Sequence, residues 1–201
     1  MSDKLTTILA AAHAHAQDVI APNVDAWNAA RAWPRDATDK AGAAGLMGLY
    51  APEELGGQGL PLSEGIQVYE QLGLGDGAYA FAVSMHNICT FAGCGYGTDA
   101  FKEKWARDLT SGRKLANFAL TEPQSGSDPM QMYTRATVND DGTWTISGAK
   151  AWVSLAGEAD IYFTVVKTSD APGHKDMAMI AIPADAPGVS FGPRYDTPSY
   201  N

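Results

Sequence analysis

A run of polar residues follows a short apolar segment in the middle of the chain, at Phe118–Asp128 (FALTEPQSGSD). Pro123 and Gly126 predict a tight turn, which would present backbone N–H groups and hydroxyls on one side. The hydroxyls are those of Thr121, Ser125 and Ser127. Such a turn suits a planar hydrogen-bonding ligand or an anionic one, although most polar turns after a strand only connect elements of structure.

A second informative segment, Gly148–Ser154 (GAKAWVS), follows further along the chain. Taken alone, Trp152 in a β-rich segment is typical of a core aromatic residue. Lys150 is interpreted as a solvated strand residue, because lysine is mostly exposed in proteins. Glu122, inside the first segment, is interpreted as a structural acceptor for backbone or basic groups rather than as a catalytic base.

Together the two segments resemble the acyl-CoA dehydrogenase family. In that family a strand leads into TEP-x-x-GSD, and G-x-K-x-W-[IV]-[ST] follows; both signatures are intact here. An upstream loop, Tyr50–Gly59 (YAPEELGGQG), is similar to a segment of the family's helical domain. The resemblance covers essentially the whole chain and implies that FAD is the cofactor.

The resemblance implies roles for four residues of the turn segment. Phe118, Leu120 and Thr121 match positions along the isoalloxazine ring of FAD, with Thr121 at its pyrimidine end. Hydrogen-bond donors there stabilise the negative charge that develops on the ring during reduction. Ser127 matches a position near the flavin phosphates and the pantetheine arm of an acyl-CoA, so it is also a predicted substrate contact.

Three residues of the second segment complete the implied cofactor site. Trp152 matches an aromatic residue that packs against the flavin. Ser154 matches a hydroxyl that faces N5, the atom that accepts the hydride, and Val153 lies between them and contributes backbone contacts. No metal ligand is predicted, because the histidines and cysteines lack metal-binding spacing.

The implied activity is the α,β-dehydrogenation of an acyl-CoA thioester, with hydride transfer to FAD. Family members continue beyond the segment that ends here at Asn201, and their C-terminal helical domain carries the base that removes the α-proton. We therefore predict no catalytic base in these residues and interpret the chain as a fragment that is inactive alone. Two alternatives stay open: a flavin oxidase or monooxygenase of the superfamily, and a non-catalytic subunit or interaction module of the same fold.

The resemblance also predicts an electron-transferring flavoprotein as partner, a role in fatty acid metabolism and a homo-oligomer, dimer or tetramer, for the intact protein. The chain has 14 basic and 23 acidic residues and a net charge of −9. This charge disfavours nucleic-acid binding, and no apolar stretch is long enough to span a membrane. With only two cysteines and no recognisable targeting signal, the predicted location is the cytoplasm.

The elements that must position these residues change in type near residue 113. Apolar residues recur at helical spacing before Pro22, and further helices are predicted over 36–49, 64–72 with Ser63 as N-cap, 78–93 and 98–110. From Lys114 onward, β-rich runs at 133–138 and 143–147 predict a hairpin, and 161–166, 177–182 and 188–191 predict more strands. The predicted fold is α+β: an N-terminal all-helical domain at 1–113, then an antiparallel β-barrel-like middle domain at 114–201, incomplete at its C-terminus.

Overall fold

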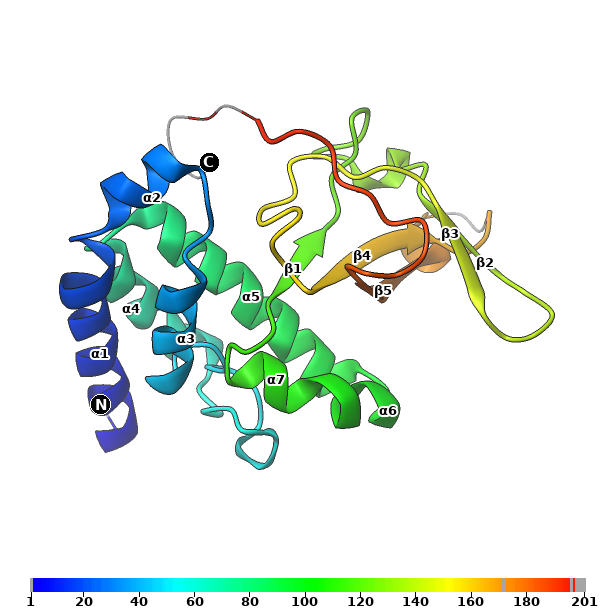
Figure 1. The fold of residues 1–201 in the computed structure, drawn as a ribbon. Helices are drawn as coiled ribbons and strands as arrows, with labels where there is room; N and C mark the ends of the chain where they lie inside the picture. Colours follow the sequence, from blue (N-terminus) through cyan, green and yellow to red (C-terminus); the bar gives the residue numbers. More distant parts are fainter. Residues whose placement is uncertain (1, 171–172, 196, 198–201) are drawn as a thin grey trace. The chain divides into compact units, whose positions relative to one another are not determined.

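The computed structural model describes residues 2–170, 173–195 and 197 (Figure 1). These residues form two compact units. The first, called here the helical unit, holds the residues up to Ala116 and the described residues from Phe191 onward. The second, the sheet unit, is Asn117–Ser190.

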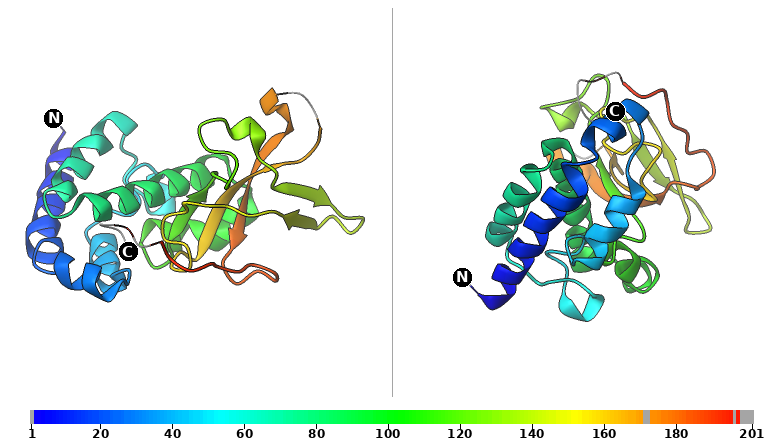
Figure 2. Two further views of the ribbon diagram at one scale, coloured as in Figure 1. Left: turned by 90° about the horizontal axis from the view of Figure 1, so that it is seen from above. Right: turned by 60° about the vertical axis from the view of Figure 1, so that its left-hand side comes forward.

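The helical unit is built from α-helices, with one long loop at residues 44–61 between α3 and α4. The longer helices are α1 (Asp3–His15), α2 (Val24–Ala30), α3 (Arg35–Ala43), α4 (Leu62–Gly73) and α5 (Gly77–Tyr96). Shorter elements are the π-helical turns Ala16–Ile20 and Lys102–Ala106, the 3₁₀ turn Glu53–Leu55, α6 (Asp99–Phe101) and α7 (Arg107–Thr110). Helix α4 packs against both α1 and α5 (Figure 2).

The helices begin where the sequence supplies caps. The hydroxyl of Ser2 accepts a hydrogen bond from the amide of Leu5 at the start of α1, and Asp76 accepts from Tyr79 at the start of α5. Thr98 caps α6 through Phe101, so the predicted helix over 98–110 is confirmed as α6, a π-helical turn and α7. Such caps satisfy N–H groups that have no partner inside the helix.

Two predictions for the helical unit are wrong in detail. The helix predicted over 36–49 ends at Ala43, because Gly45 adopts the left-handed region with φ of +75° and turns the chain. The buried residues after it are held instead by side chains of α5, as when the amide of Leu49 donates to Asn87. Ser63 is not an N-cap: α4 already starts at Leu62, directly after Pro61.

The sheet unit contains five described strands in one sheet. They are β1 (Ala116–Ala119, whose first residue lies at the unit boundary), β2 (Arg135–Val138), β3 (Trp144–Ser147), β4 (Ile161–Lys167) and β5 (Met177–Pro183). Short 3₁₀ turns lie at Pro129–Gln131 and Gly173–Asp176. Strand β4 pairs with β1, β2 and β5, so most of its side chains are buried, whereas β5 has only partly buried and exposed ones.

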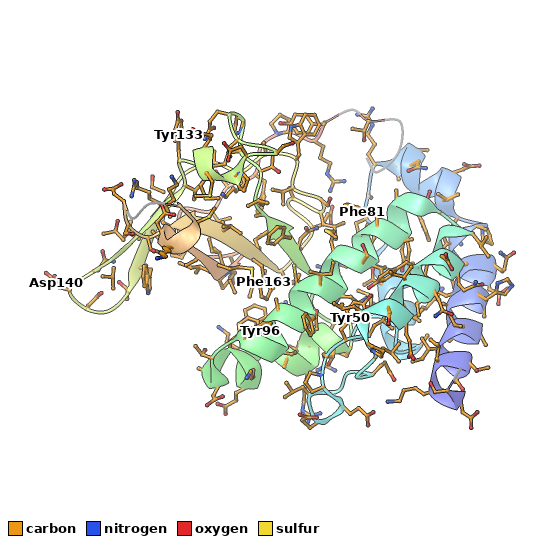
Figure 3. All side chains as sticks on the ribbon, turned by 180° about the vertical axis from the view of Figure 1, so that it is seen from behind. Tyr50, Phe81, Tyr96, Tyr133, Asp140 and Phe163 are labelled. Carbon is orange, nitrogen blue, oxygen red and sulfur yellow. The ribbon has the colours of Figure 1, made fainter. Side chains whose placement is uncertain are left out.

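The predicted hairpin is confirmed. Strands β2 and β3 pair antiparallel, with Val138 opposite Trp144, and the turn between them closes with a bond from the amide of Asn139 to the carbonyl of Thr143. Asp140 lies at its tip, and Tyr133 precedes β2 (Figure 3). The alternating polar and apolar pattern was therefore a good guide to this element.

The α+β class is confirmed, but the barrel-like description is not. The sheet is open in the order β1-β4-β2-β3, with β5 on β4. It is also not wholly antiparallel, since β2 pairs parallel to β4 at Arg135 and Lys167. The predicted strand over 188–191 is absent: Val189 instead closes a turn onto the carbonyl of Ala186. Among the described residues, no helix is long and apolar enough to cross a membrane.

Candidate functional site

The turn segment begins at the end of β1. Phe118 lies in that strand, Leu120 and Thr121 follow it, and all three are partly buried. The chain then reverses through two reciprocal bonds: the amide of Glu122 donates to the carbonyl of Ser125 over 2.9 Å, and the amide of Ser125 donates back over 3.0 Å. The tight turn predicted from Pro123 and Gly126 is therefore present.

Not all the hydroxyls of this turn point outward. Ser125 is buried, and its Oγ donates to the carbonyl of Asp128 over 2.8 Å. The expectation that Ser125 presents its hydroxyl to a ligand is therefore wrong, because the turn itself uses that donor. Ser127 is exposed, and a Cβ built on Gly126 would meet nothing within 4 Å, so this side of the turn is open.

Glu122 is the acceptor at the centre of the segment. Its carboxylate accepts bonds from the amides of Tyr133 and Thr134, over 2.6 and 3.0 Å, from the Thr134 hydroxyl, and from Gln124 over 2.7 Å. Lys150 Nζ lies 2.8 Å from the same carboxylate. Burial alone would raise the pKa of Glu122, but the hydrogen bonds from Lys150, Thr134 and Tyr133 lower it to about 2. The predicted structural role is confirmed, and a carboxylate so fully engaged is not a base.

Lys150 is not the solvated residue that the sequence indicated. Its side chain is only 10% exposed, and Nζ also donates to the carbonyl of Leu120 over 3.0 Å. The next amide, that of Ala151, donates to the carbonyl of Thr121 over 2.8 Å. These contacts hold residues 120–122 and 150–151 side by side. Two segments that the sequence separates are thus one region of the sheet unit.

The residues that follow, Ala151–Gly157, form an irregular loop, called here the Trp152 loop. Two of its non-glycine residues, Trp152 and Leu155, adopt left-handed backbone conformations with φ of 56° and 55°, and Gly157 does so with φ of 85°. These values are strained for residues with a side chain. Trp152 is nevertheless 68% exposed, while Val153 and Ser154 are partly buried.

Tyr162 of β4 holds the far end of the Trp152 loop. Its hydroxyl donates to the carbonyl of Leu155 over 2.9 Å and accepts from the amide of Gly157 over 2.8 Å. Burial raises the pKa of Tyr162, so the phenol stays protonated and able to donate at neutral pH. Sequence analysis did not single out this residue, since nothing in an apolar strand marks one tyrosine as a loop anchor.

The donor set of this region fits a flat aromatic ligand with polar edges. Trp152 is 68% exposed, and its indole is a side chain that can stack on a flat ring. Thr121 and Ser154, partly accessible on the adjoining segments, carry hydroxyls that can donate to or accept from ring heteroatoms. Among the described residues, no group of three or more histidine, cysteine, aspartate or glutamate side chains could hold a metal ion. The aromatic ring and the two hydroxyls are the features that suit this region to an organic ligand with a flat ring.

Comparison with known proteins covers both units of the chain. The family described as "Acyl-CoA dehydrogenase, N-terminal domain" matches residues 2–113, and "Acyl-CoA dehydrogenase, middle domain" matches residues 117–201. A curated relative, the mitochondrial isobutyryl-CoA dehydrogenase of Dictyostelium discoideum, is 32% identical over 186 residues, which are 92% of this chain and 44% of that protein. The chain spans about half the length of the curated relatives it matches.

Solved structures agree with the sequence matches. A chain from a structure described as the electron transferring flavoprotein of Acidaminococcus fermentans superposes with a TM-score of 0.90 and 28% identity, covering 98% of this chain and 52% of that one. A glutaryl-CoA dehydrogenase from Mycobacterium smegmatis in complex with FADH2 superposes with a TM-score of 0.83 and 26% identity, covering 94% of this chain and 47% of that one.

Proposed function

The chain belongs to the acyl-CoA dehydrogenase family, and we propose that its protein is a flavin-dependent oxidoreductase that introduces a double bond between the α- and β-carbons of an acyl-CoA thioester. When bound, FAD would accept the hydride that leaves the β-carbon while a base takes the α-proton. The M. smegmatis relative in complex with FADH2 supports the choice of cofactor. The site must then offer this flavin an aromatic wall and polar edge contacts.

One observation carries the proposal. The bond from the Ala151 amide to the Thr121 carbonyl places the start of the Trp152 loop beside the turn segment. An exposed indole and the hydroxyl-bearing turn therefore belong to one surface region of the sheet unit. A polar turn or an exposed tryptophan alone would be ordinary, but the two held together by a direct bond are what a flavin wall requires.

We assign the apolar surface against which the ring system packs to Trp152, Phe118 and Leu120. This packing excludes water from the ring. Thr121 offers its hydroxyl and backbone to the pyrimidine edge, where such donors stabilise developing negative charge. Val153 and Ser154 approach the ring near the hydride-accepting atom, and Ser127 reaches the phosphates and the pantetheine arm of the substrate.

The proposal places the catalytic base outside these residues. Glu122, the acid nearest to the site in sequence, already accepts hydrogen bonds from two backbone amides and from Lys150. A base from a C-terminal helical domain agrees with the extent of the relatives, of which this chain covers about half. The domain boundary is proposed at residues 113 and 114. Residues 1–201 alone are therefore expected to be inactive.

Further features of the proposal concern partners and location. One structural neighbour is described as an electron transferring flavoprotein, which supports such a protein as electron acceptor. A homo-oligomer, dimer or tetramer, is proposed for the intact protein by analogy with the family. A reducing compartment such as the cytoplasm suits Cys89 and Cys94, which are free and buried.

The decisive experiment uses the protein purified from its source at its natural length. We expect a yellow protein whose flavin absorbance is bleached by acyl-CoA thioesters under strict exclusion of oxygen. Bleaching that leaves no enoyl-CoA product, or turnover that depends on oxygen, would favour an oxidase or monooxygenase instead. A colourless protein that takes up no FAD would contradict the proposal and favour a non-catalytic module.

A further inference from the structure

The Trp152 loop adopts a backbone conformation that its own residues do not favour. Besides Gly157, two residues with side chains, Trp152 and Leu155, adopt left-handed conformations, which their side chains disfavour. Burial contributes little at this position, because Trp152 is 68% exposed. A conformation of this kind persists only when surrounding contacts determine it.

The first set of such contacts lies before the indole. Lys150 donates to both the Leu120 carbonyl and the Glu122 carboxylate. Glu122 is fixed in turn by the amides of Tyr133 and Thr134. Because Lys150 and Ala151 are bound to neighbouring groups of the turn, the chain enters Trp152 with its position already set.

The second set lies after the indole. The single hydroxyl of Tyr162 bonds to both the Leu155 carbonyl and the Gly157 amide. Tyr162 lies in β4, which pairs with β5 over the whole length of both strands. The exit of the loop is therefore tied to a well-paired strand, while the entry is tied to a buried ion pair.

We propose that Glu122, Lys150 and Tyr162 are positioning residues, which fix the Trp152 loop in its ligand-ready conformation before the flavin arrives. This inference rests on the proposed function, since it assigns these residues to the site where FAD would bind. None of the three needs to touch the cofactor. They act through Trp152 and Ser154, by removing the conformational freedom that binding would otherwise have to remove.

The first test needs no cofactor. Hydrogen–deuterium exchange is measured on the protein at its natural length, for the wild type, Lys150→Met and Tyr162→Phe. We expect exchange across 151–157 to quicken by about tenfold or more in both variants, and by about fivefold or more beyond any quickening of β4 and β5. Asp170→Asn is the matched control, because it removes an exposed ion pair of the same unit, that with Arg135, and is expected to change neither region.

A spectroscopic readout accompanies the exchange measurement. The near-ultraviolet circular dichroism of Trp152, obtained as the difference between wild type and Trp152→Phe, reports how rigidly the indole is held. We expect this band to fall by about half or more in Tyr162→Phe. If Lys150→Met does not fold, Tyr162→Phe alone decides, since it removes one oxygen atom and leaves the ring in place.

The outcomes separate this inference from the proposed function. Unchanged exchange and an unchanged Trp152 band in Tyr162→Phe overturn the positioning role, as does a uniform rise in exchange over the whole sheet unit. In a fluorescence titration with FAD, we expect the two variants to bind about tenfold more weakly than the wild type, and equal binding overturns the inference. A wild type that binds no FAD contradicts the proposed function instead, while the exchange data still test the loop.

Discussion

The amide of Ala151 donates to the carbonyl of Thr121 over 2.8 Å, and this one backbone bond joins the two signature segments of the sheet unit. Lys150, the residue before Ala151, donates to the carboxylate of Glu122, the residue after Thr121. The segments are therefore held by a backbone contact and a buried side-chain contact together. Because the two contacts are adjacent, the region should be sensitive to substitutions at either of them and at the residues that pack beside them.

Gly148 is expected to be intolerant of any side chain. Its φ is +152°, and a Cβ would lie 2.6 Å from the Cα of Thr134, a backbone atom that cannot move aside easily. Gly148→Ala should lower the free energy of unfolding of the sheet unit by about 2 kcal/mol or more. Gly126→Ala is the control, because its Cβ would meet nothing within 4 Å. Chemical denaturation that shows equal stability for both variants would contradict this prediction.

The Glu122–Lys150 pair should respond unequally to loss of its two members. Glu122→Gln leaves a buried ammonium with no carboxylate and turns an amide N–H₂ toward the amide of either Tyr133 or Thr134, which bind different oxygens of Glu122. It should cost about 3–5 kcal/mol of unfolding free energy. Lys150→Met leaves the carboxylate with its other donors, so a loss of about 1–3 kcal/mol is expected. Urea denaturation of both variants checks the order, and the reverse order would show that Lys150 is the dominant partner.

Acid should destabilise the sheet unit through Glu122. Its folded-state pKa of about 2 lies below the ordinary value of 4.5, so as the pH falls the unfolded state binds the proton first. The contribution is therefore complete above about pH 5 and is lost between about pH 4.5 and pH 2, and its size is on the order of 3 kcal/mol. Urea denaturation at about pH 6 and about pH 3 measures it. The Glu122→Gln variant lacks this titration, and an equal pH dependence in both proteins would rule out Glu122 as its source.

Local patterns predicted the parts of the fold that local forces determine. The hairpin of β2 and β3 followed from two alternating runs around Asn139–Gly142, and α1 and α5 followed from helical spacing of apolar residues. Whether the sheet is open or closes into a barrel could not be predicted from local patterns. It depends on how β4 pairs with strands that are distant in sequence. The end of α3 was missed because a single glycine, Gly45, overrides a helical pattern that continues beyond it.

The candidate site, too, could be predicted from the sequence only in part. The two segments were recognisable as signatures, and Glu122 was predicted to be a structural acceptor for backbone or basic groups, as it is. The burial of Lys150 was not anticipated, since lysine is normally exposed and its partner lies 28 residues away in the sequence. Tyr162 was missed for a related reason, because its role depends on the tertiary contact between its hydroxyl and the Trp152 loop.

His86 should be indispensable to the helical unit. Its Nδ1 accepts the amide of Ala116, so Nε2 carries the proton and donates toward the carbonyls of Met47 and Leu109, each 3.0 Å away. His86→Leu would leave these buried backbone groups without their partner, at a cost of about 3 kcal/mol or more. His13→Gln on the exposed face of α1 serves as control and should cost less than about 0.5 kcal/mol. Thermal unfolding distinguishes them, and similar melting temperatures would argue against this role of His86.

Trp152 should affect ligand binding far more than stability. Because the side chain is 68% exposed, Trp152→Ala removes little buried surface, and alanine meets the same left-handed backbone with a similar strain. The change in unfolding free energy should stay below about 1 kcal/mol. Loss of the indole face should weaken FAD binding by about tenfold to a hundredfold, which corresponds to the burial of one large aromatic side chain on ligand binding.

Trp144 provides the matched control for this variant. It is also an exposed tryptophan of the sheet unit, at 49%, but it lies on the β2–β3 hairpin opposite Val138. Trp144→Ala should cost up to about 1 kcal/mol of stability through the lost cross-strand pair and should leave FAD affinity unchanged. Flavin fluorescence titration of the two variants beside the wild type measures both affinities. Equal losses of affinity would mean that the indole of Trp152 is not a wall of the cofactor site, because any exposed aromatic residue of the unit would then have the same effect.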